Sequence, residues 1–213
     1  MYTFLISSYP MIIDLHNHTS RYSPCSNISP ELLIKTYIDA GVDAVCITEH
    51  DCLWQINEQI ELQAKYKGLI KIFFGIEASF DIGHVLIFCK NQKIPLNRFI
   101  DNYNNNPKSN NDFALIWAHP FRWGFGRGDI YKVDYFSKFD AVEYLNGNLT
   151  HEETMITKLH LFGKGIKLTG GSDTHSTSMA AKSATAFDSE INTIEELVDN
   201  IKTGKYKPIV LTH

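Results

Sequence analysis

The stretch MIIDLHNHTS, residues 11–20, joins a short apolar run to two histidines that stand one residue apart. Such a run is typical of a buried strand. Side chains two positions apart on a strand lie on the same face, so His16 and His18 are expected to point in one direction. An imidazole pair of this kind can bind a metal ion, but one pair alone is weak evidence. Whether this pair is part of a metal site depends on the residues that the neighbouring strands carry.

Apolar runs of similar length recur along the chain and alternate with stretches of helical pattern. This alternation favours a parallel sheet built from strand–helix units, and about seven strands in one domain favour a barrel over an open sheet. The fold class is therefore α/β. After the first run, strands are expected at 43–48, 69–77, 84–89, 113–118, 139–147, 164–170 and 207–211, and helices at 29–40, 54–67, 95–103, 150–163 and 193–204.

The composition is that of a globular protein. The 213 residues fit one domain, 1–213, in which residues 1–10 are interpreted as an N-terminal extension. With 44% hydrophobic residues and a net charge of −4, the chain resembles neither a disordered segment nor a strongly basic nucleic-acid-binding protein. No apolar run approaches the ~20 residues that span a bilayer, so no membrane partner is expected.

The four cysteines form no CxxC pair, and residues 1–10 lack the basic and small-residue features of a signal peptide. We therefore expect free thiols, a reducing compartment and a cytoplasmic location. The oligomeric state is left open by the sequence.

Histidines and acids gather where the expected strands end. In a barrel of parallel strands, the carboxyl ends meet on one face, where active sites lie. His84 instead opens its strand and must reach that face on a reversed segment. Imidazoles and carboxylates together are the usual ligands of zinc, manganese and iron, and eight such groups suit two or three divalent ions that share Glu77 or a hydroxide. The candidate ligands are His16, His18, His50, Glu77, His84, His119, Asp173 and His175.

The order of these motifs resembles that of the PHP (polymerase and histidinol phosphatase) family. The resemblance runs from about residue 11 to residue 205 and implies a distorted (β/α)7 barrel with a three-metal site and phosphoesterase activity. The segments that carry it are DLHNHTS (14–20), TEHD (48–51), GIEAS (75–79), GHVLIF (83–88), AHPFR (118–122), EYLNG (143–147) and GGSDTH (170–175).

The resemblance also implies how the ligands are shared among the ions. The first ion would be held by His16, His18, Glu77 and Asp173. Glu77 would bridge to a second ion, held also by His84 and His119. A third would be held by His50 and His175.

The chain departs from the family pattern near the first motif. A further His or Asp ligand usually follows five or six residues after the histidine pair, where this chain has Ser23 and Pro24, with Cys25 next. Three alternatives follow: Cys25 binds as a thiolate, the third ion is held weakly, or only two ions bind. We favour the weakly held third ion. Glu49 also stands where the family prefers Asp.

The expected chemistry is attack of a metal-bound hydroxide on phosphorus, because neighbouring cations bind phosphate oxygens and ionise a bridging water near neutral pH. Arg122 directly follows the AHPF segment and is the first candidate for binding the substrate phosphate and stabilising its charge. Arg127, in the glycine-bearing loop, is the second candidate for the phosphate.

The leaving oxygen needs a proton, for which Asp51, His175 and a metal-bound water are alternatives. Glu143 and Asn146, at the end of their strand, are candidates for orienting water or binding substrate.

The sequence therefore predicts a metal-dependent phosphoric ester hydrolase that acts on a small phosphomonoester or phosphodiester. A nucleotide, an oligonucleotide end and a compound like histidinol phosphate are the candidate substrates. Two alternatives stay open: a metal-dependent hydrolase of C–N or C–O bonds, and a non-catalytic binding module that metals stabilise.

Overall fold

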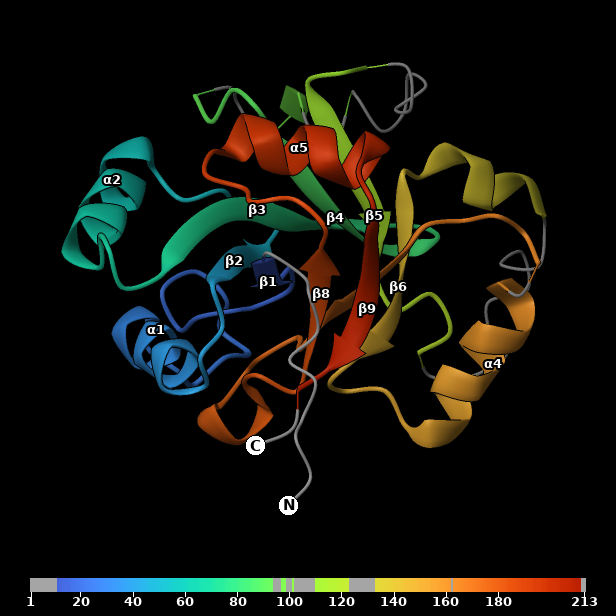
Figure 1. Cartoon of the computed structure of the whole chain (residues 1–213), viewed down its shortest axis with the longest axis horizontal. Coiled ribbons are helices and arrows are strands. Elements are labelled where there is room, and N and C mark those ends of the chain that lie inside the picture. The colour runs from blue at the N-terminus through green and yellow to red at the C-terminus, as the bar shows by residue number, and fades with distance from the viewer. Residues whose placement is uncertain are drawn as a thin grey trace.

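The computed structural model describes residues 11–93, 97, 98, 101, 110–122, 133–161 and 163–211. Nine strands within these residues form one sheet, in the order β7-β6-β5-β4-β3-β2-β1-β8-β9. The sheet curves into a nearly closed barrel with helices on its outside (Figure 1). The strands are β1 (Met11–Asp14), β2 (Ala44–His50), β3 (Lys71–Phe80), β4 (Gly83–Cys89), β5 (Phe113–Trp117), β6 (Ala141–Asn146), β7 (Leu168–Gly171), β8 (Ser183–Phe187) and β9 (Tyr206–Val210). The described helices are α1 (Pro30–Asp39), α2 (Ile56–Lys65), α4 (His151–Leu161) and α5 (Ile194–Thr203), with 3-10 turns η3 (Val133–Lys138) and η4 (Thr177–Met179).

The barrel closes at the carboxyl end of its parallel strands. β1, β2 and β3 run parallel, as do β5, β6 and β7, and β4 is antiparallel to both neighbours. Beyond the ends of β1 and β7, Asn17 and Thr174 form a parallel bridge, and the His18 amide donates to the Thr174 carbonyl over 3.0 Å. Strands β1 to β7 therefore form a ring at this end, which confirms the predicted distorted (β/α)7 barrel.

At the other end of the ring, β7 contacts two further strands, β8 and β9. β8 pairs antiparallel with β1, and β9 pairs antiparallel with β8. The Thr185 hydroxyl on β8 bonds both the amide and the carbonyl of Gly170 on β7, at 2.9 Å each. A Cβ atom at Gly170 would lie 2.5 Å from the carbonyl oxygen of Ala184, so this close approach requires glycine.

β3 and β4 are joined by a tight hairpin, with only Asp81 and Ile82 between them. Such a short connection leaves no room for a helix, and β4 therefore runs antiparallel to β3. His84 near the start of β4 lies across from Ser79 near the end of β3. The hairpin thus brings His84 to the end of the barrel where Glu77 lies, and the reversal predicted for His84 is confirmed.

The strand β8, with the sequence SATAF, is missing from the sequence-based prediction. Its small and partly polar side chains form no apolar run, yet all five residues are buried, between β1 and β9. This burial comes from neighbouring strands, which a local pattern does not show. β7 begins at Leu168 and not at 164. The expected extension 1–10 and most of the expected helix 95–103 lie outside the described residues.

The helix ends follow the signals in the sequence. α1 begins after Ser29, whose hydroxyl accepts from the Leu32 amide, and Gly41 follows its end with a φ of 69°. α5 begins after Thr193, which caps it in the same way. The apolar face of α5 packs on β4 and β5. This part of the core contains Leu197, Val198 and Ile201 from α5 and Phe88, Ala114 and Ile116 from the strands.

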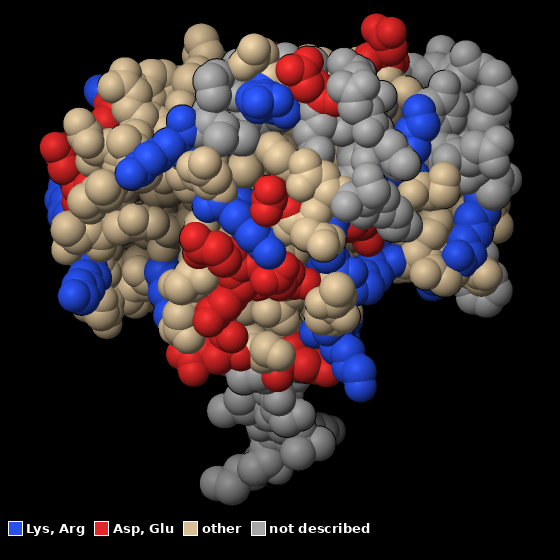
Figure 2. Space-filling model, turned by 90° about the horizontal axis from the view of Figure 1, so that it is seen from above, with Lys and Arg blue, Asp and Glu red and all other residues tan. Residues whose placement is uncertain are grey.

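The surface carries a mixture of charges. On the face seen from above in Figure 2, acidic side chains gather near the lower centre, and the basic side chains of the described residues lie in separate groups that form no continuous basic surface. None of the described helices has both the length and the apolar character that crossing a membrane requires.

Candidate metal centre

The eight candidate ligands meet at the carboxyl end of the barrel. They arrive from six strands, because each lies at, or just beyond, a strand end that faces this side. Their donor atoms form overlapping groups in which all atoms lie within 4.8 Å of one another. The groups are His16, His18, Glu77 and Asp173; His50, Glu77 and His84; His18, His50 and His175; and His16, His119 and Glu143.

Glu77 stands at the middle of this assembly. Its side chain is 1% exposed, and each of its oxygens faces the ring nitrogens of several histidines. Oε1 lies 2.8 Å from His84 Nδ1, 3.0 Å from His119 Nε2 and 3.3 Å from His16 Nε2. Oε2 lies 3.0 Å from His50 Nδ1 and 3.1 Å from His18 Nε2. A carboxylate in this position can bridge two cations.

The donor set fits divalent cations. Two buried carboxylate oxygens, Glu77 Oε2 and Asp173 Oδ1, have no hydrogen-bond partner among the described residues. His16 Nε2 and His18 Nε2 face each other at 3.1 Å, and both point toward Asp173 Oδ1, at 3.5 and 3.3 Å. Buried anionic oxygens that accept no hydrogen bond are costly, and a cation between them and the imidazoles would satisfy both. Mixed nitrogen and oxygen donors suit zinc, manganese or iron.

The pKa values of the buried groups show how strongly they interact. Burial alone would lower the pKa of His16, but the charges of Glu143, Glu77 and Asp173 raise it well above its usual value. Burial would raise the pKa values of Glu77 and Asp173, yet the charge of His16 and hydrogen bonds from histidines hold both well below their usual range. A cation bound among these groups would offset the carboxylate charge in the place of the histidines.

A further carboxylate, Glu143, orients the inner histidine His16. Glu143 lies 3.0 Å from His16 Nδ1 and accepts from the His119 amide over 3.1 Å. Its bond to Nδ1 leaves His16 Nε2 facing Glu77. Gly171 permits this arrangement, because a Cβ there would lie 2.7 Å from Glu143 Oε1. A carboxylate behind a metal-binding histidine fixes the ring and raises its basicity.

Ser23 takes the position where the family places a further ligand. It is buried, donates to Glu49 Oε2 over 2.5 Å and lies 3.3 Å from His18 Nδ1. Glu49 accepts further hydrogen bonds from the Thr19 amide and the Trp54 indole. Ser23 and Glu49 together therefore orient His18 in the way that Glu143 orients His16.

The sequence-based prediction assigned no such role to Ser23 and noted Glu49 only as a departure from the family pattern. Glu49 could have been suspected from its place next to His50, since an acid before a candidate ligand is a frequent outer partner. Ser23 and Glu49 are 26 positions apart, and only the fold brings them together.

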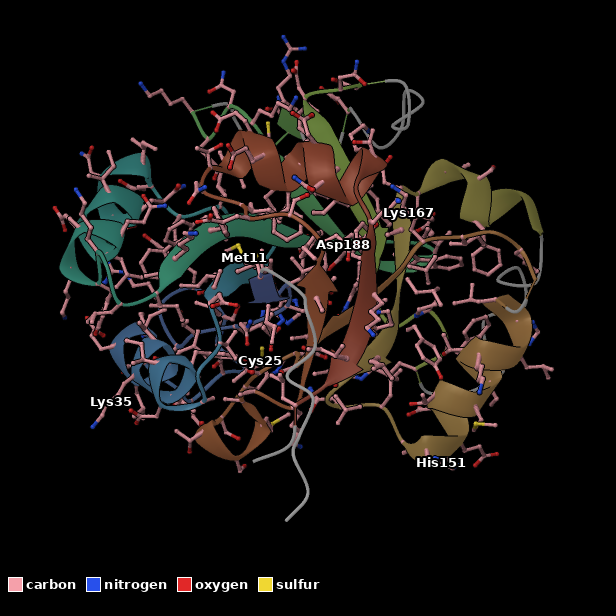
Figure 3. All side chains as sticks on the ribbon, in the orientation of Figure 1. Met11, Cys25, Lys35, His151, Lys167 and Asp188 are labelled. Carbon is pink, nitrogen blue, oxygen red and sulfur yellow. The ribbon has the colours of Figure 1, made fainter. Side chains whose placement is uncertain are left out.

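Cys25 lies in the loop after β1 and is exposed (Figure 3). None of the four donor groups formed by the described residues includes it. Partial burial and the charges of Glu77, Asp173 and Glu49 raise the pKa of its thiol in the absence of metal. The absence of Cys25 from these groups speaks against the thiolate alternative, and the number of ions stays a prediction.

The candidate phosphate-binding and proton-transfer residues have different positions. Arg122 Nη1 donates to Asp173 Oδ2 over 2.8 Å, and Asn146 Nδ2 donates to Glu143 Oε2 over 2.9 Å, so both lie beside the donor groups. Arg127 lies outside the described residues. The Asp51 carboxylate accepts from the Ser79 amide and hydroxyl, at 2.8 and 2.9 Å. Its proton-donor role stays a prediction.

Three residues of this region have left-handed backbone conformations, which are rare for residues other than glycine. They are Asp51, His119 and Asp173, with φ values of 48°, 28° and 54°. Such conformations cost free energy and concentrate at functional sites, where the surrounding structure maintains them. One further histidine, His151, is the first residue of α4 and lies at the periphery of the molecule (Figure 3).

The comparisons with known proteins agree with this geometry. The family model of the PHP domain matches residues 14–111, and that of the PHP-associated region matches residues 164–206. A comparison with curated protein sequences gave no match.

Several solved structures share the fold. An amidohydrolase from Chromobacterium violaceum has 16% identity and a TM-score of 0.58, over 77% of this chain and 87% of that chain. A candidate metal-dependent phosphoesterase from Bifidobacterium adolescentis has 12% identity and a TM-score of 0.56, over 76% and 87%. The lesion-specific endonuclease PfuEndoQ from Pyrococcus furiosus has 20% identity and a TM-score of 0.58, over 93% of this chain but 57% of that chain.

At these identities the similarity to solved structures shows the fold alone. The evidence for the family comes from the two family-model matches. Both matched segments contain residues of the donor groups, with His16, His18, His50, Glu77 and His84 in the first and Asp173 and His175 in the second. The chain belongs to the PHP family.

Proposed function

We propose that the protein is a metal-dependent phosphoesterase that hydrolyses a small phosphomonoester or phosphodiester. The observation that carries the proposal is the position of Glu77, whose two oxygens lie within 3.3 Å of nitrogens from five histidines. A buried carboxylate cannot accept hydrogen bonds from so many imidazoles in good geometry, but it can bridge cations that those imidazoles bind.

The residues would share two or three divalent ions in the pattern that the family resemblance implies. His16, His18, Glu77 and Asp173 form the most enclosed group, with side-chain exposures of 0 or 1%. His50, His84 and His175 lie nearer the surface, and His119 completes the set. When bound, neighbouring divalent ions act as Lewis acids on phosphate oxygens and lower the pKa of bound water.

The protein's own side chains would bind and orient the phosphate. Arg122 is the candidate for binding its oxygens, because the guanidinium lies beside Asp173 at the edge of the donor groups and arginine suits bidentate contact with phosphate. Its side chain is 21% exposed, so an incoming ester can reach it. Asn146 lies 3.4 Å from Asp173 Oδ2 and is the candidate for orienting substrate or water. Arg127 stays a second candidate for the phosphate.

The leaving oxygen would receive its proton from Asp51, from a metal-bound water or from His175. Both oxygens of Asp51 bond Ser79. His175 belongs to a donor group, so its imidazole can serve as the acid only where it binds no ion. Burial and the charge of His18 lower the pKa of His175, which disfavours the protonated form that an acid needs.

The partly exposed histidines at the edge of the site suit a substrate that presents a terminal phosphate. His50, His84 and His175 have side-chain exposures of 29, 23 and 18%. A nucleotide, the end of a short oligonucleotide or a compound like histidinol phosphate meets this requirement, since each carries an accessible phosphoester on a larger polar group.

A phosphate-release screen tests the proposal. The chain is stripped of metal, reloaded with Mn²⁺ or Zn²⁺, and assayed against phosphorylated metabolites, nucleotides, phosphodiesters and short oligonucleotides. We expect turnover that needs metal and that His119→Ala abolishes while the circular dichroism spectrum is unchanged. Full activity in His119→Ala would contradict the assignment.

A clustered metal centre of this kind also serves hydrolysis of C–N or C–O bonds, and one of the structures with this fold is an amidohydrolase. An amide and ester panel in the same screen separates the two activities. Turnover of amides without turnover of phosphoesters would favour the C–N hydrolase, and metal binding without any turnover would favour a non-catalytic module.

A further inference from the structure

A buried network of polar side chains lies behind the metal centre, on the side away from solvent. It consists of Asp14, Asn17, Tyr37 and Thr174, together with the Ser172 amide, and we name it the Asp14–Tyr37 clamp. Asp14, Asn17, Tyr37 and Thr174 are all fully buried. These residues come from β1, from the loop that follows it, from α1 and from the loop after β7.

Asp14 joins the two chain segments that carry the most enclosed ligands. Its Oδ1 accepts from the His16 amide over 3.1 Å and from the Ser172 amide over 3.0 Å. His16 belongs to the first segment, and Ser172 directly precedes Asp173 in the second. The Asp14 carboxylate therefore bonds the backbone of both segments, the one that carries His16 and the one that carries Asp173.

Tyr37 bonds the same two segments through its hydroxyl. The oxygen lies 2.6 Å from Asp14 Oδ2, 2.6 Å from Asn17 Oδ1 and 3.1 Å from Thr174 Oγ1. Asn17 and Thr174 are also the residues of the backbone bridge that closes the barrel. The phenol thus connects the side chains at the point where the ring of strands closes.

We infer that the clamp positions the enclosed ligands, and that its hydrogen bonds set how tightly the centre binds metal. His16 Nε2 and His18 Nε2 lie 3.5 and 3.3 Å from Asp173 Oδ1. The clamp joins the two chain segments that carry these ligands. A shift of one segment by a few tenths of an ångström changes these distances directly. Tyr37 and Asp14 are positioning residues, and Asp14 belongs to none of the donor groups of the described residues.

Three substitutions test this inference, which rests on the proposed metal site. Tyr37→Phe removes the hydroxyl of the clamp. Thr174→Val removes one partner of that hydroxyl with almost no change in volume. Tyr206→Phe is the control, because it removes the hydroxyl of a partly buried tyrosine that donates to the Ile201 carbonyl over 2.8 Å, on β9 and away from the clamp.

Each metal-free variant is checked for folding by circular dichroism. The affinity for Mn²⁺ is then measured by titration calorimetry, and the visible absorption spectrum of the Co²⁺-loaded protein is recorded. We expect Tyr37→Phe and Thr174→Val to weaken Mn²⁺ binding about 10- to 100-fold and to alter the Co²⁺ spectrum, as is typical for partners of metal ligands. Tyr206→Phe lowers the melting temperature but keeps the wild-type affinity and spectrum.

The outcomes separate this inference from the proposed function. If the wild-type protein binds metal and both clamp variants keep its Mn²⁺ affinity and Co²⁺ spectrum, the positioning role of the clamp is overturned and the proposed function is not. If Tyr37→Phe does not fold without metal, Thr174→Val decides. Absence of metal binding by the wild-type protein would overturn the proposed function and the clamp together.

Discussion

The metal centre has two halves that differ in exposure and in support. The enclosed half consists of His16, His18, Glu77, His119 and Asp173, with side-chain exposures of 0 to 4%. The rim half consists of His50, His84 and His175, with exposures of 18 to 29%.

The enclosed ligands are held from behind. Glu143 bonds His16 and Ser23 bonds His18, while the clamp fixes the backbone. In the rim, His175 Nδ1 bonds the nearby Asp173 carbonyl, at 2.9 Å, and His175 belongs to a group of three imidazoles that contains no carboxylate. The enclosed half has more carboxylate charge and more support behind its ligands, so it suits the more tightly held ion, whereas the more exposed rim suits substrate entry.

The substitution Glu77→Gln should remove the feature that both halves share. Glutamine keeps the size of the side chain but loses the negative charge that would bridge the ions. We expect loss of bound metal from both halves and a fall in turnover of at least about a thousandfold, since such ions supply several kcal/mol of transition-state stabilisation. Metal content by mass spectrometry and phosphate release measure the effect. A variant that retains its full metal content would show that Glu77 is no bridge.

The substitution His175→Ala should affect the rim alone. Removal of one imidazole from the group of His18, His50 and His175 should lose the most weakly bound ion and lower turnover about 10- to 100-fold, with the enclosed ions retained. Metal content after gel filtration gives the stoichiometry, and excess Mn²⁺ should restore part of the activity. Loss of all ions would mean that the two halves are not independent.

The substitution Cys25→Ser should have the smallest effect. Cys25 is exposed, and the donor groups of the described residues do not contain it. We expect metal content and turnover within about twofold of wild type, because a change at an exposed position without specific contacts is nearly neutral. Loss of one metal equivalent in this variant would instead support Cys25 as a thiolate ligand of the rim half.

Most of the fold could be predicted from local patterns, because the strands that carry the site are continuous apolar runs. The run before His16 and the run before His119 both become buried strands, β1 and β5. β8 is different: its residues Ser183–Phe187 are small, and their burial depends on strands that lie far away in the sequence. Only the closed sheet makes SATAF a strand.

The candidate ligands could be predicted, but their supporting groups could not. All of the ligands except His84 follow an apolar run, so strand direction predicts that these seven meet, and the short β3–β4 connection adds His84. Glu143 was expected to orient water or substrate, whereas the structure places it behind His16. Tyr37 looks like an ordinary core residue of an amphipathic helix, and its hydroxyl contacts are invisible to a helical pattern.

The sequence by itself determined the class of fold and the kinds of donor atoms, because both follow from residue types and their spacing along single strands. The tertiary structure alone decided the closure between β1 and β7, the bonding of Ser23 to Glu49, and the division of the donors into an enclosed half and a rim. The physical reason is that these features are distances between segments far apart in the chain, and such distances are fixed only when the barrel closes and excludes water from its interior.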